Sequence, residues 1–221
     1  MSSIIKQNII ISGGGTGGHL FPALSICEQE LNNYNFIYIG SIFGLESRYS
    51  KFPKEWDINL LDIRGIYREI NITNLLKNIS FPYKFIKSYL HAKSIIKSSK
   101  PKIIIGTGGY SSGIPLLVGI RLGIPTLIQE QNSIPGLVTK KLHNKVNKIC
   151  ISYKKSNEII KTNNIVLTGN PISKKIKKID KNIAKKQLNI NKDKKVILFL
   201  GGSQGASPIN DHFLSNIKYY D

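Results

Sequence analysis

Short runs of β-branched and other apolar residues alternate along this chain with longer stretches that have helical apolar spacing. The apolar runs predict seven strands, within residues 9–11, 35–40, 58–63, 102–113, 126–136, 147–152 and 164–171, the longer segments ending in glycine-rich or polar loops. Pro22 suits the first turn of a helix after the first strand. Residues 74–100 predict mostly helix, which Pro82 kinks or splits in two. This alternation predicts an α/β fold with a doubly wound parallel sheet.

The pattern changes after residue 172. Residues 173–194 are Lys-rich and weakly apolar, which predicts a linker with a short helix. From Lys195 an apolar strand, a glycine loop and a helix repeat the opening design, so we predict parts at 1–172, 173–194 and 195–221. A lone strand–helix unit cannot bury its own apolar faces. We therefore expect 195–221 to be the incomplete start of a second domain. Either the chain is a fragment, or the remaining half was lost or comes from elsewhere.

Glycine-rich loops follow three of the predicted strands, at residues 13–18, 106–113 and 201–206, and a polar string follows a fourth at 129–136. Ligands of an open parallel sheet lie beyond the carboxyl ends of its strands, so these segments can face one crevice. A glycine loop that leads into a helix also suits an anionic group such as a phosphate.

Two common nucleotide motifs fit the first loop poorly. Gly13-x-Gly15-x-x-Gly18 has the dinucleotide spacing, but the second strand ends in Gly40-Ser41 and no carboxylate follows until Glu46. A P-loop needs Lys and Ser or Thr after its last glycine, where this chain has a histidine and a leucine. An NAD site is therefore disfavoured, and ATP hydrolysis of the P-loop kind even more so.

The formal net charge of +19 suggests an anionic partner: nucleic acid, acidic lipid or a phosphorylated substrate. A general bias toward Lys, Ile and Asn explains the charge equally well.

Cys27 and Cys150 lie far apart, which favours a reducing compartment without disulfides. We see no signal peptide at the start, and Arg121, prolines and glycines make residues 113–128 a poor membrane span.

Five motifs in order identify a resemblance that spans essentially the whole chain: GGGTGGHLFPAL, GTGGYSSGIP, EQNSIPG, GNP and GGSQGA. They resemble the MurG family of peptidoglycan glycosyltransferases. The resemblance implies a GT-B fold, with a Rossmann-like N-terminal acceptor domain and a second Rossmann-like domain for UDP-N-acetylglucosamine. It also implies inverting transfer of N-acetylglucosamine to undecaprenyl-diphospho-N-acetylmuramoyl-pentapeptide (lipid I), giving lipid II.

The resemblance assigns roles to named residues and implies no metal and no cofactor. His19 would be the general base, because an imidazole titrates near working pH. Glu130 would be the second catalytic residue, and Glu130 and Tyr110 would line the same cleft. The glycine loops of the first domain, with Gly108 and Gly109, would suit the acceptor's diphosphate. UDP-N-acetylglucosamine contacts are implied for Thr16, Gly17, Gly18, Asn132 and Ser203.

Two residues depart from the family pattern. Gln129 stands where the family commonly has His, and Ser173 stands where it commonly has Arg, losing a cation that would contact donor phosphates. The family's uracil-, ribose- and sugar-recognising segments would follow Asp221, so we expect this chain alone to be inactive. The alternative is a non-catalytic, membrane-associated remnant that binds anionic lipid or a cell-wall synthesis partner.

Apolar and basic residues are interleaved around Pro82, in an arrangement that suits an anionic bilayer surface. The apolar residues are Leu75, Leu76, Ile79, Phe81, Tyr83, Phe85, Ile86 and Tyr89, and the lysines are Lys77, Lys84 and Lys87. Most of the apolar residues also have to cover the sheet. With the resemblance, they imply a peripheral protein on the cytoplasmic face of the cell membrane. A nucleic-acid partner is not expected, since the chain lacks an aromatic-rich recognition string or zinc spacing.

Overall fold

The computed structural model describes residues 6–65, 74, 78–202 and 205–220. The chain divides into two compact units, residues 1–174 and residues 175–221, which we describe separately. The prediction for Ser203 lies outside the described residues, as do those for Leu75, Leu76 and Lys77.

Unit 1 is built on a parallel sheet in the order β3-β2-β1-β4-β5-β6-β7. Its strands are β1 (Gln7–Ser12), β2 (Tyr34–Ser41), β3 (Asp57–Leu61), β4 (Ile103–Gly106), β5 (Thr126–Glu130), β6 (Lys148–Ile151) and β7 (Ile165–Leu167). Every adjacent pair is parallel, and Ile9 to Ser12 of β1 pair with Ile103 to Gly106 of β4. The predicted doubly wound sheet is confirmed, and its strand order reverses between β1 and β4.

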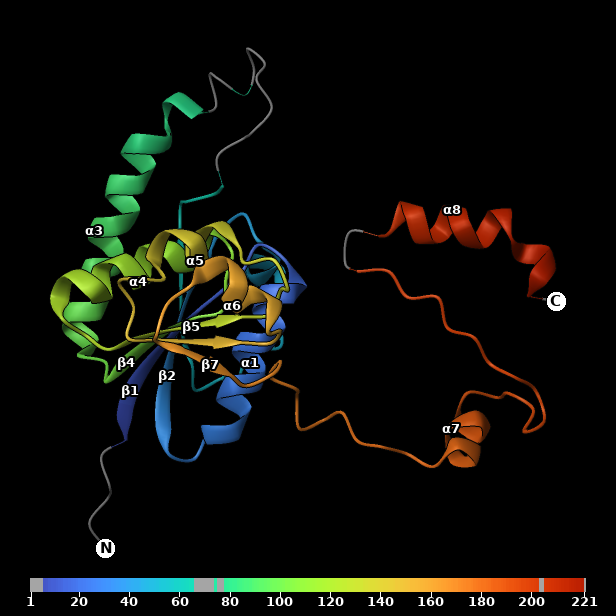
Figure 1. Ribbon diagram of the computed structural model, residues 1–221. Helices are drawn as coiled ribbons and strands as arrows, with labels where there is room; N and C mark the ends of the chain where they lie inside the picture. The colour runs from blue at the N-terminus through green and yellow to red at the C-terminus, as the bar shows by residue number, and fades with distance from the viewer. Residues whose placement is uncertain (1–5, 66–73, 75–77, 203–204, 221) are drawn as a thin grey trace, which may run out of the picture. The chain divides into compact units, whose positions relative to one another are not determined.

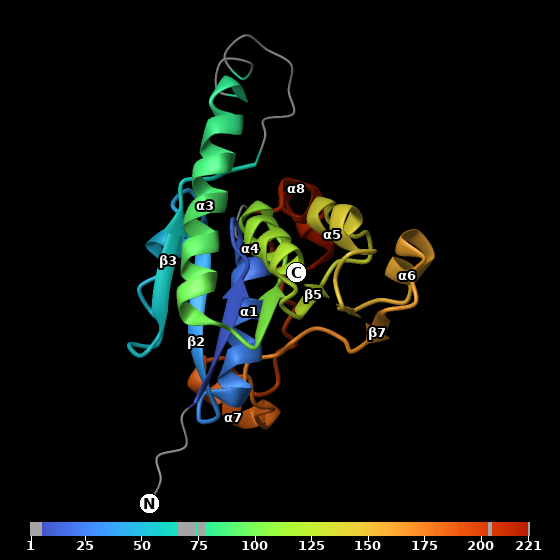
Figure 2. The same cartoon turned by 90° about the vertical axis from the view of Figure 1, so that its left-hand side faces the viewer.

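The helices of unit 1 cover the two faces of this sheet (Figures 1 and 2). They are α1 (Gly17–Glu30), the 3-10 helix η1 (Leu45–Arg48), α3 (Phe81–Ser99), α4 (Tyr110–Leu122), α5 (Leu137–Leu142) and α6 (Lys155–Ile160). On one face α1 packs its Leu20, Ala23 and Cys27 against alternate strand residues such as Ile9 and Ile11. On the other face α3, α4, α5 and α6 cover the intervening residues, including Ile10 and Ile104. This alternation is the period of two expected of strands buried on both faces.

Pro82 and Pro22 occupy different positions within their helices. Pro82 stands in the first turn of α3, which begins after Ser80, so of the two predicted outcomes the split is observed. Pro22 does not start α1 as predicted. It lies inside the helix, because Gly17 and Gly18 already adopt helical geometry ahead of it. Two glycines therefore stand at the start of the first helical turn.

Unit 2 contains α7 (Lys181–Gln187), α8 (Ser207–Ser215) and the 3-10 helix η2 (Ile217–Tyr219). Asp180 caps α7, its side chain accepting hydrogen bonds from the Asn182 and Ile183 amides. The predicted strand at 195–200 is not formed, and Leu198 and Leu200 are largely exposed. A strand needs a neighbour for its N–H and C=O groups, and the described part of unit 2 contains no other strand. The following helix α8 is present.

Candidate functional site

The carboxyl ends of β1 and β4 are joined by hydrogen bonds, which bring the first two glycine loops into contact. The Thr107 amide donates to the Ser12 carbonyl over 2.8 Å, and the Thr107 hydroxyl donates to the His19 carbonyl over 2.7 Å. The Gly14 amide also reaches the Gly108 carbonyl at 3.4 Å. The predicted convergence of these loops is therefore observed at the point where the strand order reverses, the usual ligand position in such sheets.

The contact between the two loops depends on glycine at two positions with positive φ. Gly108 has φ 98°, and a Cβ there would lie 2.6 Å from Nδ1 of His19. Gly109 has φ 77°, and a Cβ there would lie 2.1 Å from the Gly14 carbonyl oxygen. Side chains at either position would force the loops apart, so the glycines set their close approach.

Helix α1 begins directly over this contact. Thr16 is its N-cap, and Gly17 and Gly18 form its first turn, so their backbone lies at the positive end of the helix dipole. Pro22 has no N–H for the Gly18 carbonyl, and this carbonyl instead accepts a 2.6 Å hydrogen bond from Gln131 Nε2. Gln131 follows β5, so a third strand end is tied to the same place.

His19 is half-buried where the three strand ends meet. Its Nδ1 lies 3.1 Å from the Thr107 carbonyl oxygen and 3.1 Å from Gln131 Nε2. Gln131 Nε2 already directs hydrogens to the Thr107 and Gly18 carbonyls, each over 2.6 Å. Nδ1 of the neutral imidazole therefore carries the hydrogen and donates to Thr107, which leaves the Nε2 lone pair to accept a proton.

Burial lowers the pKa of His19 below its ordinary value of 6.5. The Thr107 carbonyl raises this pKa, and the Glu130 and Glu46 carboxylates raise it more weakly, but desolvation dominates. The imidazole is consequently held in its neutral, proton-accepting form at neutral pH. This is the protonation state that a general base needs.

Glu130, the other predicted catalytic residue, is only 3% exposed and is surrounded by donors from the loop that follows β5 and from α5. Its carboxylate accepts hydrogen bonds from the amide and side-chain nitrogens of Asn132, the Gly136 amide and the Thr139 hydroxyl, at 2.6–3.1 Å. These contacts fit a carboxylate that shapes the loop better than one that reacts. Through them Glu130 fixes the exposed Asn132 beside Gln131 and the rest of the site.

We expect Glu130→Gln to destabilise the chain by about 2–4 kcal/mol, because its amide nitrogen cannot accept from the donors around it. Urea unfolding measures the loss. Glu158→Gln, which changes an exposed carboxylate on α6, serves as the control and should leave the unfolding midpoint nearly unchanged. Equal midpoints for the two variants would contradict the loop-shaping role.

Comparison with known proteins places this site in a family. The model of the glycosyltransferase family 28 N-terminal domain matches residues 9–151, which contain both glycine loops, His19 and Glu130. This chain belongs to glycosyltransferase family 28. The match covers the whole region in which the three strand ends converge.

Curated relatives agree with this family. The UDP-N-acetylglucosamine–N-acetylmuramyl-(pentapeptide) pyrophosphoryl-undecaprenol N-acetylglucosamine transferase of Christiangramia forsetii is 38% identical over 96% of the chain, and that of Bacillus subtilis is 35% identical over 92%. The chain spans 58% and 56% of the lengths of these two relatives.

Solved structures agree as well. The crystal structure of MurG from Acinetobacter baumannii matches with a TM-score of 0.62 and 26% identity, over 76% of this chain and 47% of that one. A UDP-N-acetylglucosamine 2-epimerase matches with a TM-score of 0.53 over 75% of this chain and 48% of that one. At 12% identity, this second likeness shows the fold alone.

Gln129 and Ser173, the two residues that depart from the family pattern, both form hydrogen bonds in the structure. Gln129, which is 2% exposed, places its Nε2 3.2 Å from the Ser152 hydroxyl and 3.3 Å from the Gly169 carbonyl. The Ser173 hydroxyl donates to Glu28 of α1 over 2.7 Å. Both side chains therefore hold the end of unit 1 to neighbouring elements.

Two side chains important to the site were not among the predicted residues. Gln131 joins the β5 end to His19, and Glu46 of η1 accepts a hydrogen bond from the Gly15 amide of the first glycine loop. Gln131 could have been noticed as the centre of the EQN string. Glu46 carries no such signal, because its contact with the loop depends on the course of the chain after β2.

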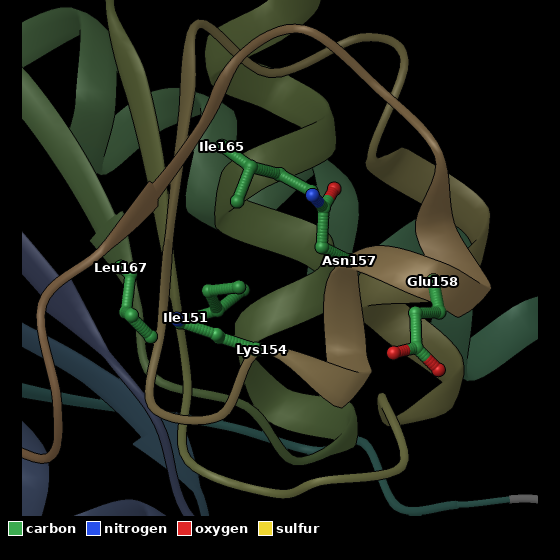
Figure 3. A pocket seen from close by; sticks show the side chains of 6 residues that line it. All are labelled: Ile151, Lys154, Asn157, Glu158, Ile165 and Leu167. Atoms are coloured by element: carbon green, nitrogen blue, oxygen red, sulfur yellow. The ribbon is translucent and has the colours of Figure 1, made fainter.

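One hollow on the surface of unit 1 has no His19 in its lining. This hollow, shown in Figure 3, is formed by the end of β6, α6 and β7, and its lining consists of Ile151, Lys154, Asn157, Glu158, Ile165 and Leu167. None of the predicted site residues is in this lining.

Within the described residues, no group of three or more His, Cys, Asp and Glu side chains could hold a metal ion. The converging strand ends thus remain the candidate site.

Proposed function

We propose that this chain provides the acceptor side of an inverting N-acetylglucosaminyltransferase. The donor would be UDP-N-acetylglucosamine and the acceptor undecaprenyl-diphospho-N-acetylmuramoyl-pentapeptide, as the names of its curated relatives suggest. The product would be the lipid-linked disaccharide used in peptidoglycan synthesis. The observation that carries the proposal is the neutral imidazole of His19, held by the Thr107 carbonyl where three strand ends of a family 28 domain converge.

The geometry suits each part of this reaction. The acceptor hydroxyl must lose a proton as its oxygen attacks the anomeric carbon, and Nε2 of His19 is the group that would take it. The bond from the sugar to UDP breaks as the new bond forms, so negative charge develops on the diphosphate. The amides of Thr16, Gly17 and Gly18 at the start of α1 would stabilise anionic groups there. Gly108, Gly109 and Tyr110 at the start of α4 would serve the acceptor's diphosphate.

A transfer assay tests this proposal with radiolabelled UDP-N-acetylglucosamine and the lipid-linked acceptor. The chain itself is assayed beside a fusion in which residues 1–194 are followed by the corresponding remainder of the Christiangramia forsetii relative. We expect both proteins to bind the acceptor and the fusion to transfer the sugar. Acceptor binding without transfer by the folded fusion would favour the non-catalytic alternative, and a lack of acceptor binding by the folded chain would contradict both.

We also propose that α3 docks this protein on an anionic membrane surface, at the cytoplasmic face where such an acceptor would be reached. The α3 residues Phe81, Phe85 and Tyr89 pack against the core. On the solvent side, Tyr83, Ile86 and Leu90 are 69%, 59% and 57% exposed, at the spacing of one helix face. The exposed Lys87 follows Ile86 directly, beside this stripe. An apolar stripe beside lysines is typical of helices that lie in a membrane interface.

The position of α3 supports this docking. Helix α3 ends just before β4 begins, so its C-terminal end lies near the starts of the strands. Its N-terminal half therefore lies near the carboxyl ends of the strands, the end of the sheet that carries the glycine loops. Figures 1 and 2 show this half projecting beyond the sheet. No helix among the described residues is long and apolar enough to cross a membrane. A surface attachment through α3 would bring the candidate site close to a lipid-linked acceptor.

Flotation with lipid vesicles measures the docking. We expect the chain to float with anionic vesicles and much less with neutral ones, and the double variant Ile86→Ser/Leu90→Ser to lose most of this binding. Ile183→Ser/Leu188→Ser removes two exposed apolar side chains from unit 2 without changing the charge and is the matched control. Equal flotation with both kinds of vesicle, no flotation, or loss only in the control would contradict docking through α3.

A further inference from the structure

Glu46 is a buried carboxylate directly beneath the first glycine loop. It is 2% exposed, and its two oxygens accept hydrogen bonds from two separate segments. Oε1 accepts from the Ser41 amide at the end of β2 over 2.9 Å, and Oε2 accepts from the Gly15 amide over 2.8 Å. We propose that Glu46 is a positioning residue that fixes the glycine loop, and through it the start of α1 and His19, for the transfer reaction proposed above.

Three glycines make room for this carboxylate. A Cβ on Gly14 would lie 2.1 Å from Glu46 Oε1, one on Gly44 would lie 2.1 Å from Oε2, and one on Gly40 would lie 2.8 Å from Cγ. Gly44 has φ −91°, which any residue adopts, so backbone conformation does not explain glycine there. The space that these glycines leave is filled by the Glu46 side chain. Gly40 and Gly44 lie just before Glu46 in the chain, whereas Gly14 is brought beside it only by folding.

The loop is held on both sides of Gly15, which has φ 88°. Its amide donates to Glu46, and its carbonyl accepts from the Leu45 amide at 3.4 Å. The Tyr110 ring packs against Gly15, since a Cβ there would lie 3.3 Å from Tyr110 Cε1. Helix η1 therefore clamps the residue that leads into the N-cap of α1, and a shift of Gly15 would move both Tyr110 and the segment that carries His19.

The geometry requires a carboxylate of this length. An amide at position 46 would place an NH2 group against a backbone N–H, so Gln can satisfy only one of the two donors. Asp keeps the negative charge but is shorter by one methylene group and cannot span from Gly15 to Ser41. Glu46→Gln and Glu46→Asp therefore lose the same clamp, whereas only Gln loses the charge. This pair separates positioning from simple electrostatics.

Amide hydrogen exchange followed by NMR tests the clamp without any need for turnover. In both Glu46→Gln and Glu46→Asp, we expect exchange at Gly15 to accelerate by about tenfold or more, with little change at Ile10 in the sheet core. Glu30→Gln at the exposed end of α1 is the control and should leave both amides unchanged. Unchanged exchange at Gly15, or equal acceleration at Gly15 and Ile10, would overturn the proposal.

The transfer assay supplies the functional readout with the fusion protein. We expect kcat to fall about tenfold or more in both variants, with KM for each substrate within about threefold, because the loop loses its shape and not its composition. Recovery of wild-type kcat by Glu46→Asp would overturn the proposal in favour of a charge effect. If wild-type transfer is absent but the Gly15 exchange responds, the proposed function fails and the Glu46 clamp stands.

A double-mutant cycle covers the case in which Glu46 variants unfold. Gly44→Ala places a methyl group where the carboxylate lies, so we expect it to lower the folding equilibrium constant by at least about tenfold. In the Glu46→Ala background the same substitution should have a much smaller effect, because the obstacle is gone. Equal effects in the two backgrounds would mean that the glycine does not serve the carboxylate, which overturns the proposal.

Discussion

His19→Ala is expected to lower transfer by about 10²–10⁴-fold in the fusion protein, the range typical of removing a general base. The reason is the tautomer that the structure imposes. Thr107 accepts the Nδ1 hydrogen, so Nε2 is the nitrogen that can accept the acceptor's proton. Alanine leaves the surrounding glycine loops in place and removes only this proton acceptor. Binding of the lipid-linked acceptor should therefore change far less than turnover.

His143→Ala is the matched control for this prediction. The His143 imidazole lies at the end of α5, where its Nδ1 is 2.9 Å from the Lys140 carbonyl oxygen, away from the converging loops. We expect His143→Ala to keep wild-type turnover. Transfer by His19→Ala within about twofold of the wild type, at an unchanged folding stability, would contradict the role of His19 as base.

The pH dependence follows from the lowered pKa of His19. The base is active when neutral, so the acidic limb of kcat/KM should lie below pH 6.5, the ordinary value for histidine. The unfolded chain binds this proton more readily than the folded chain, so the free energy of unfolding should fall as pH drops from about 6.5 toward the lowered pKa. His19→Ala should remove that slope. A pH titration of the His19 ring by NMR measures the pKa directly.

The sequence predicted the sheet well because its signals are local and repeated. Each strand is a short apolar run such as Ile9–Ile11, and buried parallel strands need little else to be identified. The convergence of the loops at Gly14 and Gly108 also followed, since parallel strands end at one edge of a sheet. These inferences required the order of elements and no detailed geometry.

The differences arose where distant residues decide the local structure. Pro22 was expected to start α1, but the Gly18 carbonyl that it leaves unpaired is satisfied by Gln131 from another strand end. Residues 195–200 have the composition of a strand, yet no neighbouring strand is present in the described part of unit 2. Glu46 enters the sequence analysis only as a carboxylate that comes too late after the second strand to hold a ribose, whereas its partners are the amides of Ser41 and Gly15. Each case depends on a long-range partner that no local pattern encodes.

Gly109→Ala is expected to destabilise unit 1 by about 3–5 kcal/mol, the largest stability effect that we predict for a single added methyl group. Gly109 has φ 77° and ψ 164°, a combination that is essentially closed to residues with a Cβ and costs about 1–3 kcal/mol by itself. The new methyl group would also lie 2.1 Å from the Gly14 carbonyl oxygen, which is backbone and cannot move independently. The two glycine loops must separate to admit it.

Gly123→Ala is the comparison variant that lacks the clash with a neighbouring backbone. Gly123 also has positive φ, at 70°, but a Cβ there meets nothing within 4 Å, so alanine should cost only about 1–2 kcal/mol. Denaturant unfolding compares the two variants. Separation of the loops in Gly109→Ala should also expose His19 to water, and since burial is what lowers the pKa of His19, that pKa should rise toward 6.5. Equal destabilisation by the two alanines, with His19 unchanged, would mean that the loops do not depend on each other, and the convergence that defines the candidate site would lose its physical basis.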